Sequence, residues 1–435
     1  MNARHRGTRR SAVVISGLAV AAVAALAPTA TAGTAAATTA HNEQVALVNE
    51  TDAQPVDTKS HLNGTAQVAS YDGSSVVFST TAALVPSDTN GTDDVYLRTD
   101  GITILVSARG ETIGNDSSFE PTISDDGRFV AFTTAATNLI GKKDTNKHVL
   151  DVVVRDMYAP KITLVSQSSA GFQRGQNSFF PVISGNGRAV SFQTYGAFGR
   201  KDDDNKEDVY VRYLRKGVTK QASLLPGPGG DVRGPVGNGD ISDDGHKVVW
   251  GNSEMLWMRD LSSGETIRFW HERAGGAPCS GFPAGTAGRP VISGDGRFAA
   301  FSSCGTDLPG DNETGGVYRI DLTTGKLRTV AVGSDGNSYL PSLSRTGRYV
   351  GFGSEASDLV AGDTEGQPDA FVADLRSRTI TRASQNTDGV GGNSWNATTS
   401  AAISGDGHTL VYTSYSDNLV AGDLYNYEEA FAWHG

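Results

Sequence analysis

The chain has 435 residues, more than a single hydrophobic core usually organises, so we expect several domains or a repeat architecture. It contains 53 Gly but only 4 Met and 2 Cys, and this balance favours turns over helices and excludes a helical bundle. The formal net charge of -11 argues against a nucleic-acid-binding surface, because phosphate recognition requires clustered Lys and Arg.

The first 32 residues have the layout of a secretory signal peptide. Basic residues between Arg4 and Arg10 precede an apolar run at residues 11–26, and Ala30-Thr31-Ala32 resembles a cleavage site. The Arg9-Arg10 pair also fits a twin-arginine signal, so both export routes stay open. We therefore expect a secreted, extracytoplasmic protein with a disordered Ala/Thr-rich linker at residues 33–42. No later stretch is apolar enough to span a membrane.

One hairpin motif recurs seven times along the rest of the chain. Its strongest copies, at residues 121–132, 181–192 and 290–301, read P-x-I-S-x-(D/N)-G-R followed by alternating apolar positions. A Gly at the turn permits a positive φ, and the preceding Asp or Asn suits side-chain hydrogen bonding to the turn. The turn glycines are Gly73, Gly127, Gly187, Gly245, Gly296, Gly347 and Gly407.

Each hairpin is followed by a third strand and, in six units, by a fourth. Third strands are predicted at 94–98, 151–155, 208–212, 255–259, 317–320, 369–372 and 429–433. Fourth strands are predicted at 102–106, 162–165, 218–223, 266–270, 327–330 and 379–383. Four antiparallel strands per unit are typical of a propeller blade. Residues 44–49 supply the strand missing from the last unit, which predicts an all-β, seven-bladed β-propeller over residues 43–435 closed by its N-terminal strand.

This hairpin, with its D-(V/A)-(Y/F)-V-R third strand, resembles the WD-like repeat of the TolB-like family of exported bacterial propellers. The resemblance covers residues 44–435 and implies the propeller fold. The family includes periplasmic binding and scaffold proteins, non-catalytic propellers of prolyl-oligopeptidase-like enzymes and some lyases, so it implies no single function. TolB proteins have six blades and a further N-terminal domain, and this chain departs from both features, so a role in the Tol system is not implied.

The loop between second and third strands carries an acidic pattern in several units. Side chains with oxygen atoms alternate along this loop, and a carboxylate stands at its end. Such a set of ligands suits Ca²⁺, the one cofactor that we expect. Alternatively, these side chains satisfy loop backbone groups and begin the next strand. The candidate metal ligands are Asp88, Asn90 and Asp94; Asp144, Asn146 and Asp151; Asp202, Asp204 and Asp208; and Asp363, Glu365 and Asp369.

Aromatic residues follow Asn or Asn-Ser just before the first strand of four units, on the same predicted face as the acidic loops. They are Phe119, Phe179, Tyr339 and Trp395. Such rings can stack on a sugar or grip a peptide, or they can pack between neighbouring blades. We expect Trp395, in the longest polar loop, to be the exposed one.

The two cysteines, Cys279 and Cys304, flank the first hairpin of the fifth unit. In an exported protein they are expected to form a disulfide that stabilises the fold by loop closure, and two buried thiols are the alternative.

Catalytic motifs are scarce. The chain has no G-x-S-x-G nucleophile motif, and its eight His residues show no paired metal spacing. The leading interpretation is an exported, non-catalytic, monomeric propeller that acts as a binding module for a protein or glycan partner. The alternative is a carbohydrate-active lyase or hydrolase with its site at the mouth of the propeller channel, and a third possibility is an extracytoplasmic assembly scaffold.

Overall fold

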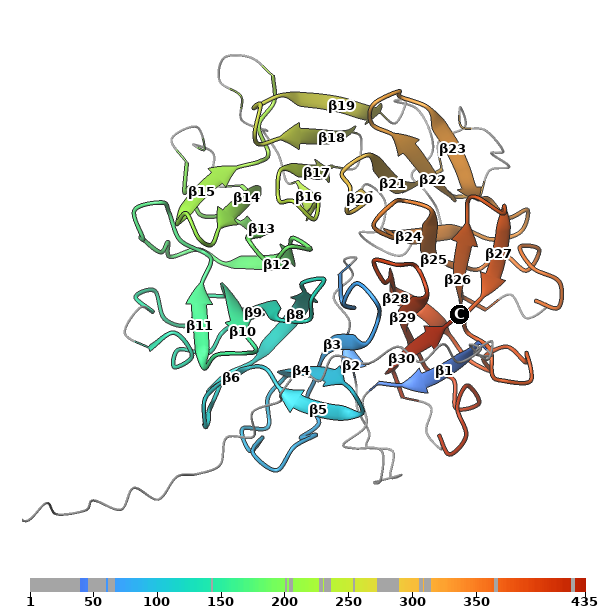
Figure 1. The fold of residues 1–435 in the computed structure, drawn as a ribbon, viewed down its shortest axis with the longest axis horizontal. Coiled ribbons are helices and arrows are strands. Elements are labelled where there is room, and N and C mark those ends of the chain that lie inside the picture. Colours follow the sequence, from blue (N-terminus) through green and yellow to red (C-terminus); the bar gives the residue numbers. More distant parts are fainter. Residues whose placement is uncertain are drawn as a thin grey trace, which may run out of the picture. The chain divides into compact units, whose positions relative to one another are not determined.

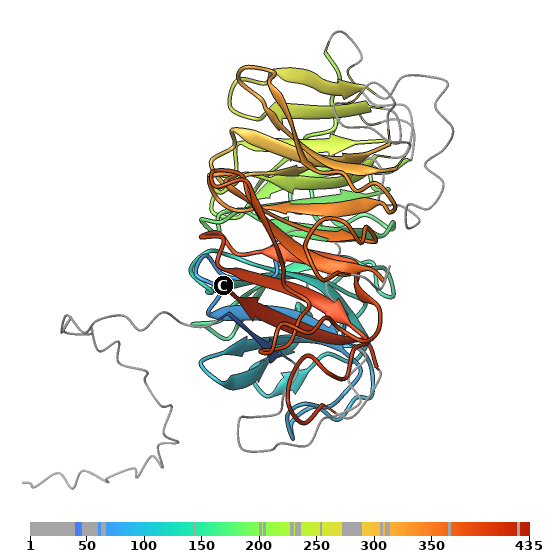
Figure 2. The same ribbon diagram turned by 90° about the vertical axis from the view of Figure 1, so that its right-hand side faces the viewer.

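The seven repeat units fold as seven four-stranded antiparallel sheets arranged around a central axis (Figure 1). The computed structural model describes residues 40–45, 60–61, 67–141, 144–199, 202, 206–226, 230, 236–252, 255–271, 289–304, 308, 314–363, 367–423 and 427–435. The predicted signal peptide, most of the predicted linker, Asp204, Cys279 and Glu365 lie outside these residues. The predicted all-β, seven-bladed propeller is confirmed. Figure 2 shows the sheets edge-on, with the connecting loops gathered at two faces.

The strands of each blade follow one another in the chain from the channel outward, except in the last blade. Blade 1 contains β2 (Ser60–His61), β3 (Ser75–Thr80), β4 (Asp94–Thr99) and β5 (Ile102–Leu105). Blade 2 contains β8 (Ser118–Ile123), β9 (Phe129–Thr134), β10 (Asp151–Asp156) and β11 (Lys161–Leu164). Blade 3 contains β12 (Ser178–Ile183), β13 (Ala189–Thr194), β14 (Asp208–Tyr213) and β15 (Val218–Gln221). Blade 4 contains β16 (Gly237–Ile241), β17 (Lys247–Gly251), β18 (Met255–Asp260) and β19 (Thr266–His271). Blade 5 contains β20 (Val291–Ile292), β21 (Phe298–Ser303), β22 (Gly316–Asp321) and β23 (Leu327–Ala331). Blade 6 contains β24 (Ser338–Leu343), β25 (Tyr349–Ser354), β26 (Asp369–Asp374) and β27 (Thr379–Arg382). Blade 7 contains β28 (Asn396–Ile403), β29 (Thr409–Ser414), β30 (Glu429–His434) and β1 (His41–Gln44), and a small hairpin of β6 (Ala108–Arg109) and β7 (Thr112–Ile113) joins blades 1 and 2.

The recurring turn is held by the Ser and Asp of its motif. In blade 2 the Ser124 hydroxyl accepts the amide of Phe129 at 3.0 Å and donates to Asp126 Oδ1 at 2.6 Å, while Gly127 takes a φ of 69°. The matching Ser accepts the matching amide in all seven blades. The motif is therefore a hydrogen-bonded turn that sets the register of the two inner strands.

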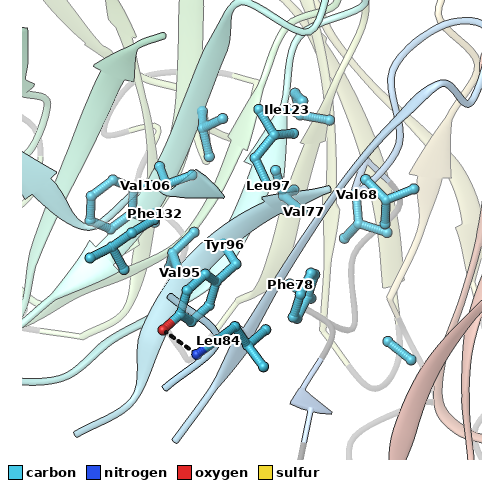
Figure 3. Close-up of a cluster of buried hydrophobic side chains, with 14 of the residues drawn as sticks. Val68, Val77, Phe78, Leu84, Val95, Tyr96, Leu97, Val106, Ile123 and Phe132 are labelled. Atoms are coloured by element: carbon cyan, nitrogen blue, oxygen red, sulfur yellow. Dashed lines mark hydrogen bonds between the residues drawn. The ribbon is translucent and has the colours of Figure 1, made fainter. Parts of the chain in front are cut away.

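An aromatic pair between the second and third strands fills the interior of six blades. In blade 1, Phe78 lies opposite Tyr96 and the two rings stack with centroids 5.9 Å apart. Equivalent pairs occur in blades 3 to 7. Figure 3 shows the blade 1 pair packed among aliphatic side chains, with Phe132 of blade 2 close by. Such cross-strand pairs stabilise the sheet and bury large apolar areas between blades.

The N-terminal strand completes the last blade, as predicted, but a few residues earlier in the chain. β1 pairs with β30 so that Gln44 lies opposite Phe431, and the Val45 amide donates to Ala430 O at 2.8 Å. The strand was expected at residues 44–49, of which 46–49 lie outside the described residues. The apolar alternation of that segment pointed to the later position. The buried partners of Asn42 explain the earlier one, because its amide donates to Ala383 O and accepts the hydroxyl of Tyr412.

A closed belt of backbone hydrogen bonds joins all seven hairpin turns around the channel. Every bond in it measures between 2.8 and 3.0 Å. The bonds run from Tyr71 N to Asp125 O, Asp125 N to Gly185 O, Asn186 N to Asp243 O, Asp243 N to Gly294 O, Asp295 N to Arg345 O, Arg345 N to Gly405 O and Asp406 N to Tyr71 O. Each blade is thus bonded to the next, and the last to the first.

Candidate binding face and central channel

The acidic loops lie on the face that carries the connections between second and third strands, here called the loop face. In blade 1, Asp94 begins β4 and its carboxylate accepts hydrogen bonds from Ser107 and, at 2.7 Å, from the amide of Asn90. Asp88 accepts the hydroxyl of Tyr96, which also accepts the Leu84 amide at 3.3 Å (Figure 3). These carboxylates therefore tie the loop to the sheet.

The bond to the Asp that begins the third strand, from the Ser two residues after the end of the fourth strand, recurs in blades 2, 3 and 6. The bonded pairs are Ser166 with Asp151, Ser223 with Asp208, and Ser384 with Asp369. In each blade the same Ser accepts the amide that follows the Asp. The Ser lies 13 residues after the Asp in blade 1 and 15 residues after it in the others, a spacing that the sequence shows and that could have revealed the pairing.

The remaining predicted ligands divide between hydrogen bonds and ion pairs. Asp202 accepts the Tyr210 hydroxyl at 2.8 Å, and Asp144 accepts the Lys147 amide at 3.1 Å. The amide of Asn146 donates to Arg174 O at 2.9 Å. The Arg382 guanidinium lies 3.5 Å from the carboxylate of Asp363 and 3.7 Å from that of Asp369, which it neutralises. Most of the described ligand side chains thus have protein partners.

Negative charge still accumulates in two of these loops. Burial, reinforced by the nearby carboxylate of Asp88, raises the pKa of Asp94 to about 6. Burial and Asp144 likewise raise the pKa of Asp151 to about 6. Among the described residues no group of three or more His, Cys, Asp and Glu side chains is placed to hold a metal ion. Each predicted ligand set contributes two described carboxylates.

Three of the four candidate aromatics belong to the innermost strands. Phe119, Phe179 and Tyr339 are each the second residue of β8, β12 and β24. Tyr339 is only 1% exposed, and Phe119 and Phe179 are half-buried. The Phe179 ring lies 5.1 Å from that of Phe180 and 5.7 Å from that of Tyr195. Tyr339 is therefore a core residue, and the Phe179 ring packs against other aromatic rings of its own blade.

Trp395 is the exposed member of the set, as expected, with 58% of its surface accessible. It precedes β28 and accepts the amide of Tyr415 at 2.9 Å through its backbone oxygen. It is not the structural counterpart of Phe179, because the bulge in β28 after Asn396 is two residues longer than the bulge in β12. The longer bulge shifts Trp395 out of the inner strand and onto the loop face.

Two blades carry a matching Tyr–Glu pair on the loop face that sequence reasoning missed. The Tyr195 hydroxyl donates to Glu207 at 2.5 Å in blade 3, and the Tyr415 hydroxyl donates to Glu428 at 3.1 Å in blade 7. Both tyrosines are more than a third exposed, and the hydrogen bond to Glu207 raises the pKa of Tyr195. The signal was a Tyr just after the second strand with a Glu just before the closing acid of the same loop.

A half-buried acid and a half-buried base from distant blades meet beside the innermost strands. Glu120 precedes Pro121 at a bulge in β8, and its carboxylate accepts the Thr133 hydroxyl at 2.7 Å and the Phe180 amide at 2.8 Å. Burial raises the pKa of Glu120, and the charge of Arg289 from blade 5 opposes this rise. The Arg289 guanidinium lies 5.8 Å from the ring centroid of Phe180.

An ion cluster joins three blades at the opposite end of the channel, here called the turn face. The guanidinium of Arg345 from blade 6 lies 3.2 Å from Asp125 of blade 2 and 2.7 Å from Asp243 of blade 4. It also lies 5.2 Å from the ring centroid of Tyr71. Burial and the neighbouring Asp125 charge raise the pKa of Asp243 to about 6.

Cys304 follows β21, and Cys279 lies outside the described residues, so the disulfide between them stays a prediction. In the described part of the chain, no helix has the length and apolar character needed to cross a membrane.

No protein-family model and no curated protein sequence matches this chain. Among solved structures, an oligogalacturonate lyase in complex with manganese is similar, with 13% identity, 91% of this chain and 96% of that chain covered, and a TM-score of 0.54. The β-propeller domain of the Trilobed protease from Pyrococcus furiosus is similar at 13% identity, with 85% and 95% covered and a TM-score of 0.51. TolB from Acinetobacter baumannii matches at 13% identity over 71% of this chain and 64% of that chain, with a TM-score of 0.39. The expected similarity to this group of propellers is confirmed as a similarity of fold, a fold that binding proteins and enzymes share.

Proposed function

We propose that this protein is an exported, non-catalytic propeller that binds a glycan or protein partner on its loop face. The exposed cluster of Trp395, Tyr415 and Glu428 in blade 7 supports this proposal. Trp395 offers a flat apolar surface, and the Tyr415 hydroxyl and Glu428 carboxylate beside it offer polar groups of the kind that orient a bound sugar or peptide. The propeller supplies a rigid base for these side chains.

The second Tyr–Glu pair, on blade 3, extends the proposed surface to the other side of the channel mouth. Tyr195 and Glu207 of blade 3 form the same hydroxyl–carboxylate hydrogen bond as Tyr415 and Glu428 of blade 7. Two similar patches on one rigid ring favour an extended partner over a small one, because a long glycan or a protein surface can contact both.

The test screens a panel of polysaccharides for binding and for reaction products, and it captures protein partners by pull-down. Trp395→Ala should weaken binding of a polysaccharide from the panel, or of a captured protein, by about tenfold, which corresponds to the loss of one aromatic anchor. Ile102→Ala is the matched control, since Ile102 is 59% exposed at a turn on the other face. An equal loss of affinity in both variants would show that Trp395 is not part of the binding site. Chemical turnover of any polysaccharide in the panel would overturn the non-catalytic proposal.

A carbohydrate-active lyase or hydrolase is the second candidate. It is favoured by Glu120, a half-buried carboxylic acid with a raised pKa that lies near the charge of Arg289. Acids whose pKa is raised by burial are common in catalytic sites. A similar fold occurs in a protein named as an oligogalacturonate lyase. Product formation that Glu120→Gln abolishes would establish this candidate.

We further propose that export depends on residues 1–32 and that the acidic loops hold structural calcium. The raised pKa values of Asp94 and Asp151 support the second proposal, because a site that concentrates buried negative charge is stabilised by a bound cation.

A further inference from the structure

A basic groove lies on the turn face between blades 2 and 3. Its cavity has a volume of about 450 Å³ and is bounded by residues from both blades. Four cationic side chains line it: Arg128, Lys161, Arg188 and Arg215. Phe129 and Leu214 are among its apolar lining residues. The groove is remote from the loop face, because it is built from the hairpin turns and from the ends of the third strands.

The repeat explains why Arg188 forms no ion pair with any residue that the structure describes. In blade 2 the Arg after the turn Gly, Arg128, forms two hydrogen bonds to Asp156 at the end of the third strand, at 3.0 and 2.9 Å. The same bonded pair recurs in blades 5 and 6. In blade 3 the residue in the position of Asp156 is Tyr213, whose hydroxyl donates instead to Gly245 O of blade 4.

The groove contains two acids, Asp126 and Asp156, against four bases, and Lys161 lies opposite Asp156 on the neighbouring strand. Asp156 is occupied by Arg128, and Asp126 accepts the Ser124 hydroxyl and the Arg128 amide within its own turn. Within the described part of the chain, no ion pair involves Lys161, Arg188 or Arg215. These three exposed cations therefore converge on one cavity in a chain whose net charge is -11.

We propose that this groove binds a small ligand with two oxyanion groups, carboxylates or phosphates, of about the size of a disaccharide. The cavity falls within the range of roughly 300 to 1,000 Å³ that is typical of small-molecule sites. The planar guanidinium groups of Arg188 and Arg215 match carboxylate and phosphate oxygens in bidentate geometry, and Lys161 adds a point charge. Tyr158 is 77% exposed at the edge of the groove, where the Arg128 guanidinium lies 5.5 Å from its ring centroid, and it offers a surface for stacking.

The test compares three probes by calorimetry at low ionic strength: digalacturonate with two carboxylates, fructose 1,6-bisphosphate with two phosphates, and neutral maltose. We expect one of the anionic probes to bind and maltose not to bind. Arg188→Gln and Arg215→Gln should each weaken binding by about tenfold. Arg297→Gln is the matched control, because Arg297 occupies the same repeat position in blade 5 and is paired with Asp321. All three arginines are largely exposed in the free protein, so thermal melting should show each variant folded.

The two anionic probes separate the possible sources of the ligand, since preference for digalacturonate indicates an acidic sugar and preference for the bisphosphate indicates a phosphorylated one. Equal weakening by Arg297→Gln would show diffuse attraction and overturn the proposal. So would unchanged binding in Arg188→Gln, or the absence of binding of both anions up to about 10 mM, beyond the weakest affinity of a specific site. Trp395→Ala should leave this binding unchanged, so the experiment tests the groove independently of the proposed binding site on the loop face.

Discussion

At the scale of single residues, Asp240 is a carboxylic acid where blades 2 and 6 have a hydroxyl. In blades 2 and 6 a hydroxyl at this inner-strand position, on Thr122 or Ser342, accepts an amide of the next blade. Asp240 accepts the Ile292 amide at 2.7 Å and the Ile241 amide at 2.8 Å. Complete burial raises its pKa to about 7, and the charge of Asp243 contributes to this rise.

This raised pKa predicts a pH dependence of stability. In the unfolded chain Asp240 loses its proton near pH 4, whereas in the folded protein it retains the proton up to about pH 7. The folded state therefore binds more protons in this window, and the contribution of Asp240 to stability falls as pH rises from about 4 to 7. In thermal melts we expect Asp240→Asn to gain stability relative to the wild type across this window, with a constant difference above it.

Asp388→Asn is the control for this measurement, because Asp388 is exposed. Its melting temperature should follow that of the wild type at every pH. A difference between Asp240→Asn and the wild type that does not change between pH 4 and pH 8 would show that Asp240 is ionised throughout.

At the scale of elements, strand bounds follow closely from local sequence. The predicted third and fourth strands of blade 3, 208–212 and 218–223, correspond to β14 (Asp208–Tyr213) and β15 (Val218–Gln221). The agreement arises because Asp and Gly fix where each strand begins and ends, through side-chain bonds and positive φ that act over a few residues. The repeat pattern grouped Trp395 with Phe179, and the longer bulge in β28 makes the two positions inequivalent, because a bulge, unlike a turn, has no composition signal of its own.

The acidic loops allow a direct test of calcium. If the loops bind it, calcium raises the melting temperature relative to excess chelator, and Asp94→Asn reduces the rise. The pKa of about 6 for Asp94 and Asp151 makes the effect larger at pH 8 than at pH 5, because protonated carboxyl groups do not bind the ion. An identical melting temperature with calcium and with chelator at pH 8 would leave the Asp–Ser hydrogen bonds as the whole role of these acids.

At the scale of the whole molecule, ring closure depends on a single short strand. Asn42 in β1 donates to Ala383 O at 2.9 Å and to Gln385 O at 2.6 Å and accepts the Tyr412 hydroxyl at 2.9 Å. It therefore joins the N-terminus to blades 6 and 7. The belt of hydrogen bonds around the turns and the cluster of Arg345 with Asp125 and Asp243 also need all the blades in place.

We expect Asn42→Ala to lower the free energy of unfolding by about 2 kcal/mol, because it removes the hydrogen bonds that Asn42 makes with the buried Tyr412 hydroxyl and with two carbonyl groups. Denaturant melts measure this change, with Glu111→Ala at an exposed turn as the control. A loss no greater than that of the control would show that β1 contributes little to closure.

The sequence by itself determined the number of blades, the position of nearly every strand and the closure by the N-terminus. These features repeat, and each depends on turn chemistry or on alternation within about a dozen residues. Only the tertiary structure decided which side chains meet beside the innermost strands and in the groove between blades 2 and 3. Glu120 and Arg289, or Arg188 and Lys161, come from different blades, and their proximity follows from the curvature of the ring, which no local pattern encodes.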